Sequence, residues 1–202
     1  MIVVDNITIK FGNKVIFENF TAKFSDLDIY CIVGKSGCGK STLLRAISGL
    51  LKPSAGQIIV NDKVVKKPSA EIAVMYQRYE NYPWLSVLDN TLFPVKMQRK
   101  ITNADKDRAV DILERFGLAD DLKKLPHELS GGMNQRLAMA SVIMNNPPVL
   151  LMDEPLSALD PENREKLQDF LLEFNNGDNQ IIIVTHSMEE AEKLSKGKIL
   201  KL

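Results

Sequence analysis

In some segments of the chain the hydrophobic residues have the spacing typical of β-strands, and in others the spacing typical of α-helices. Short apolar or alternating runs predict strands in the first third, and they lie at 2–4, 7–9, 15–17, 29–33 and 57–60. A Gly12-Asn13 turn separates two of them, and an Asn61-Asp62 turn makes 57–65 a predicted hairpin. Apolar residues take helical spacing after Gly39, between 102 and 116, and after Gly132. The last third returns to buried strands at 149–152 and 180–184, each followed by a helical pattern.

Strands that alternate with helices predict an α/β fold with a mostly parallel sheet and a small antiparallel β portion. No long linker or repeat divides the chain, so we expect a single domain over residues 1–202. Within it, residues 1–77 and 147–202 would form the α/β core. Residues 78–146 would form an inserted helical subdomain, in which Thr102 with Asp105 resembles a helix-capping pair.

Composition narrows the class of protein. The 202 residues include 26 Lys plus Arg and 26 Asp plus Glu, and this balance argues against a nucleic-acid partner held by bulk positive charge. No apolar run approaches the roughly 20 residues of a membrane-spanning helix, and the N-terminus lacks a secretory signal. Cys31 and Cys38 make no disulfide or metal framework. We therefore expect a cytoplasmic protein.

A glycine-rich segment connects the predicted strand 29–33 to the helix after it. It fits the phosphate-binding pattern G-x-x-x-x-G-K-[ST] with Gly34, Lys35, Ser36, Gly37, Cys38, Gly39, Lys40 and Ser41, and Thr42 follows. Glycines let successive N–H groups converge on phosphate oxygens, and the helix N-terminus adds its positive end. Lys40 would reach the β- and γ-phosphates, and the Ser41 hydroxyl would bind Mg²⁺. The segment therefore predicts a nucleoside-triphosphate site in a P-loop NTPase core.

Two carboxylates follow the buried strand 149–152. Ligands gather at the carboxyl ends of parallel strands, which is also where the phosphate loop lies. Asp153 would hold Mg²⁺, and Glu154 would orient and deprotonate the attacking water. Taken alone, such a pair is more often a solvated turn, but the phosphate loop upstream favours the catalytic interpretation.

The segment 129–136, Leu-Ser-Gly-Gly-Met-Asn-Gln-Arg, resembles the signature sequence of ATP-binding-cassette (ABC) ATPases. Further motifs match that family in order. They are Phe11 as an aromatic that stacks on adenine, Gln77 as the Q-loop glutamine, 157–160 as the D-loop and His186 as the switch histidine. The resemblance extends from the first strands to at least Glu190. Met133 and Asn134 depart from the commonest signature residues.

This resemblance implies a head-to-tail homodimer with two ATP molecules between the subunits. Ser130, Gly131 and Gly132 would form a second anion site that grips the γ-phosphate of ATP held by the facing subunit. Asp160 would line the interface. The resemblance also implies that Glu154, His186, Gln77 and Lys40 act in catalysis and that Ser41, Gln77 and Asp153 hold Mg²⁺.

The stretch 79–90 is similar to the P-W-x-[TS]-V-x-D-N segment of importer ATPases, particularly the nitrate, sulfonate and taurine type. The resemblance implies that Tyr82, Pro83 and Trp84 contact integral-membrane permease subunits, with an extracytoplasmic solute-binding protein in the same system. The ATPase would then lie at the inner face of the cell membrane. A purely structural interpretation is that Tyr82 and Trp84 pack the helical subdomain against the core.

The sequence also supports expectations for three single residues and alternative hypotheses for the function. Phe11 could be a core residue, and Cys31 is expected to be an apolar filler. Cys38 lies near a helix N-terminus and Lys40, both of which favour a thiolate. The second functional hypothesis is a cassette ATPase that moves no solute, such as an assembly or DNA-repair ATPase, with an iron–sulfur assembly type as one possibility. A nucleotide-regulated binding module without turnover is the third, and the presence of Glu154 and His186 argues against it.

Overall fold

The computed structural model describes residues 1–25, 27–77 and 81–202, and its elements follow one another in the order of the predicted alternation. The strands are β1 Ile2–Phe11, β2 Lys14–Phe24, β3 Ile29–Val33, β4 Ala55–Val60, β5 Lys63–Val64, β6 Ile72–Met75, β7 Val149–Asp153, β8 Gln180–Thr185 and β9 Ile199–Lys201. The helices are α1 Lys40–Ile47, α2 Val87–Lys96, α3 Asn103–Arg115, α4 Gly131–Ile143, α5 Pro161–Phe174 and α6 Met188–Ser195. Two short 3₁₀ turns, Ala119–Asp121 and Pro126–Glu128, lie between α3 and α4.

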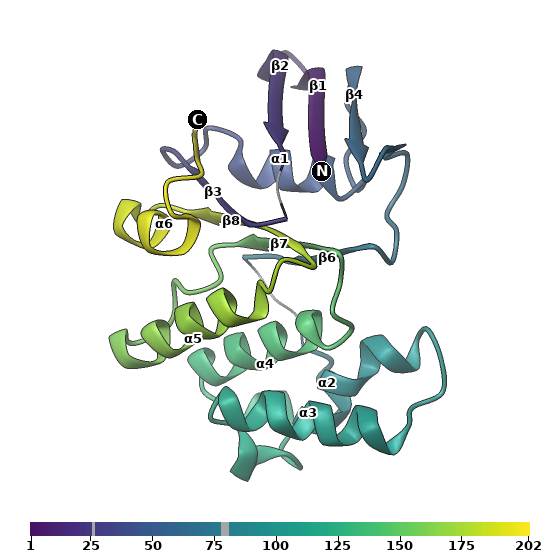
Figure 1. Cartoon of the computed structure of the whole chain (residues 1–202), viewed down its shortest axis with the longest axis vertical. Coiled ribbons are helices and arrows are strands. Elements are labelled where there is room, and N and C mark those ends of the chain that lie inside the picture. Colours follow the sequence, from purple (N-terminus) through teal and green to yellow (C-terminus); the bar gives the residue numbers. More distant parts are fainter. Residues whose placement is uncertain (26, 78–80) are drawn as a thin grey trace.

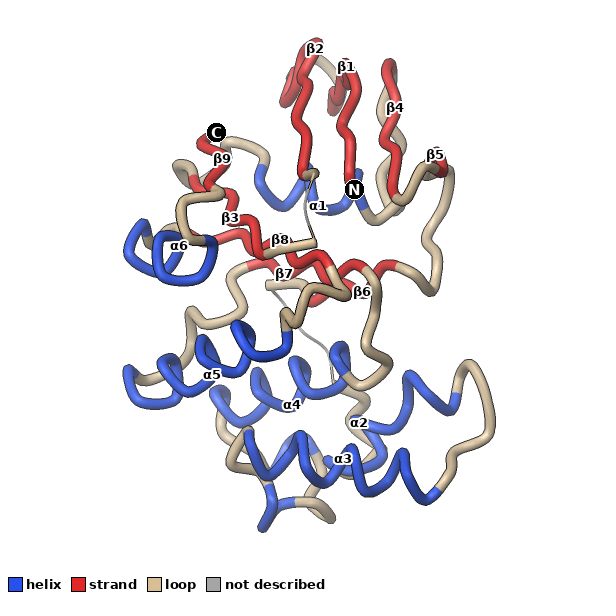
Figure 2. Tube along the Cα trace, viewed as in Figure 1, coloured by secondary structure: helices blue, strands red, loops and turns tan. Residues whose placement is uncertain are grey.

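The strands form two sheets. An antiparallel sheet has the order β2-β1-β4-β5, and a parallel sheet has the order β6-β7-β8-β3-β9. The antiparallel sheet lies at the top of Figure 1, the parallel sheet crosses the middle, and α2 to α5 lie below it. Figure 2 shows the same division as a strand-rich upper part and a helical lower part. The predicted α/β fold with a parallel sheet and an antiparallel portion is confirmed.

Both faces of the parallel sheet are covered, and each face belongs to a different hydrophobic core. Alternate residues of a strand point to opposite faces, so Ile32 and Leu151 pack with α1 and the antiparallel sheet. Cys31 and Leu150 point the other way, into the core formed with the remaining helices. As Figure 1 shows, α1 therefore lies on one face of the parallel sheet and α4 on the other.

The structure corrects several predicted boundaries. The runs 2–4 and 7–9 belong to one strand, β1, because the chain continues through an irregularity at Asn6, whose φ is +50°. The helical spacing of apolar residues after Gly39 continues to Leu50 and Leu51 and predicts a helix that reaches them, but helix α1 ends at Ile47. The helix expected after Gly132 begins two residues earlier, at Gly131. Helix α2 and strands β6 and β9 were not predicted; α2 carries Pro94 in its interior, which is typical of a helix break.

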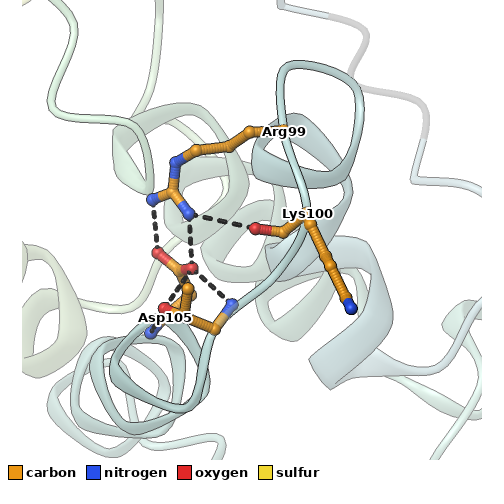
Figure 3. A network of polar contacts seen from close by, with 4 residues as sticks. Arg99, Lys100 and Asp105 are labelled. Carbon is orange, nitrogen blue, oxygen red and sulfur yellow. Dashed lines mark hydrogen bonds and ion pairs between the residues drawn. The ribbon is translucent and has the colours of Figure 1, made fainter.

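A cluster of polar side chains holds the connection between α2 and α3 against the start of α3. The Arg99 guanidinium donates to both carboxylate oxygens of Asp105 at 2.7 Å, and it also donates to the Lys100 carbonyl oxygen (Figure 3). Asp105 accepts in addition from the backbone N–H of Thr102, and Thr102 caps α3 in return, as the capping pair predicted. Hydrogen bonds from Arg99 and Thr102 hold the pKa of Asp105 well below its usual range.

None of the helices in the described ranges is long and apolar enough to cross a membrane.

Candidate active site

The loop between β3 and α1 curls back on itself at the carboxyl edge of the parallel sheet. The Cys38 backbone N–H donates to the Lys35 carbonyl oxygen at 3.3 Å, and Leu43 donates to the Gly39 carbonyl oxygen at 2.8 Å. Gly39 has a φ of +109°, and a Cβ there would approach the side chains of Ile16 and Phe17 to 2.7 and 2.9 Å. Strand β2 thus supports the loop from behind, and only glycine fits at position 39.

Lys40 lies inside this loop. Its side chain is buried, and its Nζ donates to the carbonyl oxygens of Gly34 at 2.7 Å and Lys35 at 3.1 Å. These bonds hold the ammonium group within the curl that the loop backbone forms. A phosphate bound by the N–H groups of the loop would therefore meet a positive charge already in position.

Ser41 and Asp153 lie together beneath the loop. Burial raises the pKa of Asp153, while a hydrogen bond from Ser41 and the charge of Lys40 oppose that rise. A nearby cation would stabilise the charged form of this buried carboxylate. Mg²⁺ takes few oxygen ligands from protein, and phosphate and water complete its coordination shell. Among the described residues no three His, Cys, Asp or Glu side chains gather into a metal site. The Asp153 carboxylate and the Ser41 hydroxyl are oxygen donors of the kind that Mg²⁺ prefers, so their chemistry fits the predicted ion.

Glu154 occupies the centre of a second cluster at the same edge. Its Oε2 accepts a hydrogen bond from Gln77 Nε2 at 3.1 Å, and its Oε1 lies 3.8 Å from His186 Nδ1. Gln77 follows β6, Glu154 follows β7 and His186 follows β8, and these three parallel strands are adjacent. The topology therefore brings together three of the four residues predicted to act in catalysis, across more than a hundred residues of sequence.

The signature residues lie on the surface of the helical side. Ser130 caps α4 by accepting from the Met133 N–H at 3.2 Å, and Ser130 and Gly131 are exposed. Their helix lies on the face of the parallel sheet opposite to α1. Asp160 caps α5, accepting from the N–H and Nδ2 of Asn163, and these bonds lower its pKa. Its exposed position agrees with a place at an interface.

Two aromatic predictions are resolved by exposure. Phe11, at the end of β1, is 52% exposed, so the interpretation that it is a core residue is wrong. Trp84 is 72% exposed, so it does not serve mainly to pack the helical region against the core. Tyr82 packs within the helical region, where its ring centroid lies 4.3 Å from that of Phe93 in α2, and it is still 39% exposed. Residues 79 and 80 of the predicted contact stretch lie outside the described residues.

One residue near the site had no predicted role. Gln135, within the signature segment, donates from Nε2 to the backbone carbonyl oxygen of Glu154 at 3.3 Å. Its place in α4 could be read from the helical pattern, but no local signal joins it to a residue that follows β7.

Comparison with known proteins decides the family. A family model described as "ABC transporter" matches residues 17–157. This chain belongs to the ABC transporter family. The resemblance found in the sequence is thereby confirmed, and the matched segment contains the phosphate loop, the signature and both strand-end carboxylates.

Relatives within the ABC family show which branch it resembles. The taurine import ATP-binding protein TauB of Roseobacter denitrificans is 41% identical over 175 residues, covering 86% of this chain and 65% of the relative. The bicarbonate transport ATP-binding protein CmpD of a Synechocystis species is 37% identical over 184 residues, covering 89% of this chain and 65% of the relative. The chain therefore spans about two thirds of the length of these relatives.

A solved ABC structure has the same fold. It is the dimeric structure of a post-hydrolysis state of the ATP-binding cassette MJ0796, bound to ADP and Pi. The TM-score is 0.88 at 28% identity, and the match covers 100% of this chain and 94% of that chain. The fold is that of an ATPase cassette.

The two cysteines of this ABC cassette should react very differently with a thiol reagent. Cys38 is half-buried in the phosphate loop, whereas Cys31 is fully buried in β3 and burial raises its pKa to about 12. We expect N-ethylmaleimide to modify Cys38 alone and to block nucleotide binding, because the adduct fills the loop. MgATP should protect, as peptide mass spectrometry and phosphate release can show. Cys38→Ser is the control and should be insensitive; full activity after stoichiometric modification of Cys38 would contradict the expectation.

Proposed function

We propose that this chain is the ATP-binding and ATP-hydrolysing subunit of an ABC transporter. The observation that carries the proposal is the position of the Glu154 carboxylate, held between Gln77 and His186 at the sheet edge that also carries the phosphate loop. A carboxylate held in a fixed position beside the phosphate site can orient a water molecule and accept its proton. The family match and the ATPase fold support the same conclusion.

Each group in the cluster has a separate task in this proposal. The loop N–H groups and Lys40 bind the phosphates, and Phe11 offers an exposed ring on which adenine can stack. Ser41, Asp153 and the Gln77 amide oxygen would hold Mg²⁺, which supplies charge neutralisation on the phosphates. Glu154 would orient the attacking water and accept its proton, and His186, whose Nδ1 lies 3.8 Å from Glu154 Oε1, would contact the γ-phosphate. The Gln77 amide N–H keeps Glu154 from turning away.

The two anion sites of the chain support a head-to-tail dimer. Helices α1 and α4, which begin at the phosphate loop and at the signature, cover opposite faces of the parallel sheet, and we infer that the two anion sites of one chain do not reach the same triphosphate. Two chains related head to tail can, because each presents Ser130 to the nucleotide of the other. ATP then joins the subunits, and hydrolysis removes the γ-phosphate contact that holds them.

The contact with the permease is proposed at two neighbouring hollows in the surface. One, of about 700 Å³, lies between β6, α2 and α4; the other, of about 720 Å³, is lined by Trp84, Pro83 and the start of α4. Both are lined by Asn81 and Tyr82, so the loop carrying the exposed Trp84 separates them. A short helix of a membrane subunit fits such an aromatic-lined groove. The relatives named for taurine import and bicarbonate transport support a transporter of a small solute, and we propose a solute with a sulfonate-like or other anionic group. A solute-binding protein would belong to the same system.

Changing Trp84 to Ala tests the coupling to a membrane partner. The chain would be co-expressed with candidate permease subunits from the same organism and reconstituted in lipid discs. We expect Trp84→Ala to lose both copurification and permease-stimulated hydrolysis while the basal hydrolysis of the isolated chain is unchanged, because the exposed Trp84 ring packs on Tyr82 and takes no part in the bonds that hold Glu154. Leu50→Ala, which removes an exposed apolar side chain elsewhere, is the matched control. Undiminished stimulation in Trp84→Ala would contradict the docking site and would favour an ATPase that moves no solute.

A further inference from the structure

We propose that Gln135 is a positioning residue for hydrolysis, which holds the backbone of Glu154 so that its carboxylate faces Gln77 and His186. The inference rests on the proposed role of Glu154 and adds to it a link from the signature helix α4 to the catalytic carboxylate. Gln135 would act through Glu154 and would not touch the nucleotide.

The backbone of Glu154 needs to be held. Its φ is +52°, in the left-handed region that residues with a Cβ adopt at a cost. Such a conformation persists only where the surrounding contacts determine it. On the sheet side, the Glu154 N–H donates to the Val184 carbonyl oxygen at 2.9 Å. On the other side, the Glu154 carbonyl oxygen accepts from Ser157 Oγ at 3.0 Å and from Gln135 Nε2 at 3.3 Å.

Gln135 is a costly residue for its position if stability alone mattered. It is only 2% exposed, and its Oε1 is buried without a hydrogen-bond partner in the described part of the chain. A buried amide oxygen without a partner lowers stability, so an apolar side chain of the same length would suit this place better. What the amide provides here is the hydrogen bond from Nε2 to the Glu154 carbonyl oxygen. We therefore assign the amide to the site and not to the core.

The turn that carries Gln135 is anchored on the docking side as well. Asn81 Nδ2 donates to both the backbone and the side-chain oxygen of Asn134 at 2.9 Å, and Asn134 Nδ2 donates to the Pro126 carbonyl oxygen at 2.8 Å. Asn81 lines both hollows proposed for the permease. A partner that displaces Asn81 would displace the first turn of α4 and, through Gln135, the peptide of Glu154.

Gln135→Met tests the inference, and Gln180 supplies a closely matched control. Gln180 is also fully buried, donates to one backbone carbonyl oxygen, that of Phe24, and leaves Oε1 without a partner among the described residues. It lies at the start of β8, at the amino ends of the parallel strands, whereas the catalytic cluster lies at their carboxyl ends. Gln135→Met and Gln180→Met therefore make the same chemical change at the same burial. Thermal unfolding of both measures any general effect.

We expect Gln135→Met to lower kcat by about tenfold to a hundredfold while the KM for MgATP and nucleotide affinity stay unchanged, since misplacing a reacting group acts on the chemical step. Gln180→Met should keep the wild-type kcat. In a Glu154→Gln background, Gln135→Met should cause no further loss, because the group it positions is already disabled. If Gln135→Met does not fold, Gln135→Leu replaces it.

Three results would overturn the inference: an unchanged kcat in Gln135→Met, an equal loss in Gln180→Met, or a further loss in the Glu154→Gln background. Failure of the proposed function is distinguishable from these, because it would show as undiminished hydrolysis in Glu154→Gln alone.

Discussion

Replacing Glu154 with Gln should lower ATP hydrolysis by about 10²–10⁴-fold, because an amide of the same shape cannot accept the proton of the attacking water. Binding of MgATP should survive, since the phosphate loop, Lys40 and Asp153 are untouched. Because the nucleotide is no longer consumed, the ATP-joined dimer should accumulate. Phosphate release and light scattering with MgATP measure the two effects on the same sample.

The control for this substitution is Glu165→Gln. Glu165 is an exposed carboxylate on α5, so its replacement makes the same change of charge away from the site. It should hydrolyse ATP as the unchanged chain does. Glu154→Gln activity within about twofold of the unchanged chain would mean that another group takes the proton.

Mixing two inactive variants should restore hydrolysis. Lys40→Ala removes the charge from the phosphate loop, and Ser130→Glu places a negative charge where the γ-phosphate of the facing chain is expected. Each variant alone has two damaged sites. In a mixed dimer the damage falls on one site, and the other pairs an intact loop with an intact signature. Equal mixing should therefore restore about a quarter of the activity, as half of the dimers are mixed and half of their sites are intact.

This experiment separates a head-to-tail dimer from a chain that acts alone. Ser130 is exposed, so Ser130→Glu should fold, and circular dichroism checks it. The matched control is a chain that carries both Lys40→Ala and Ser130→Glu, and its dimers should stay inactive. No recovery on mixing, or full activity of Ser130→Glu alone, would show that the signature serine does not serve a neighbouring subunit.

Most of the motifs could be located from the sequence because each is local. The phosphate loop is eight consecutive residues between a strand and a helix, and the cap at Thr102 depends on residues three apart. The parallel sheet followed from the alternation of strands and helices. The end of α1 and the interior of α2 were harder, since an apolar pair beyond a helix and a proline within one contradict the local pattern.

The sequence by itself was enough to predict the family, the α/β fold and the side chains proposed to carry the chemistry, because those predictions depend on residue types at short spacing. Only the tertiary structure decided that Gln77, Glu154 and His186 meet, that α1 and α4 lie on opposite faces of the sheet, and that Gln135 reaches the Glu154 carbonyl. It also decided that Phe11 and Trp84 are exposed. These facts follow from the order of strands in the sheet and from packing between distant segments, and neither is a property of any short stretch of chain.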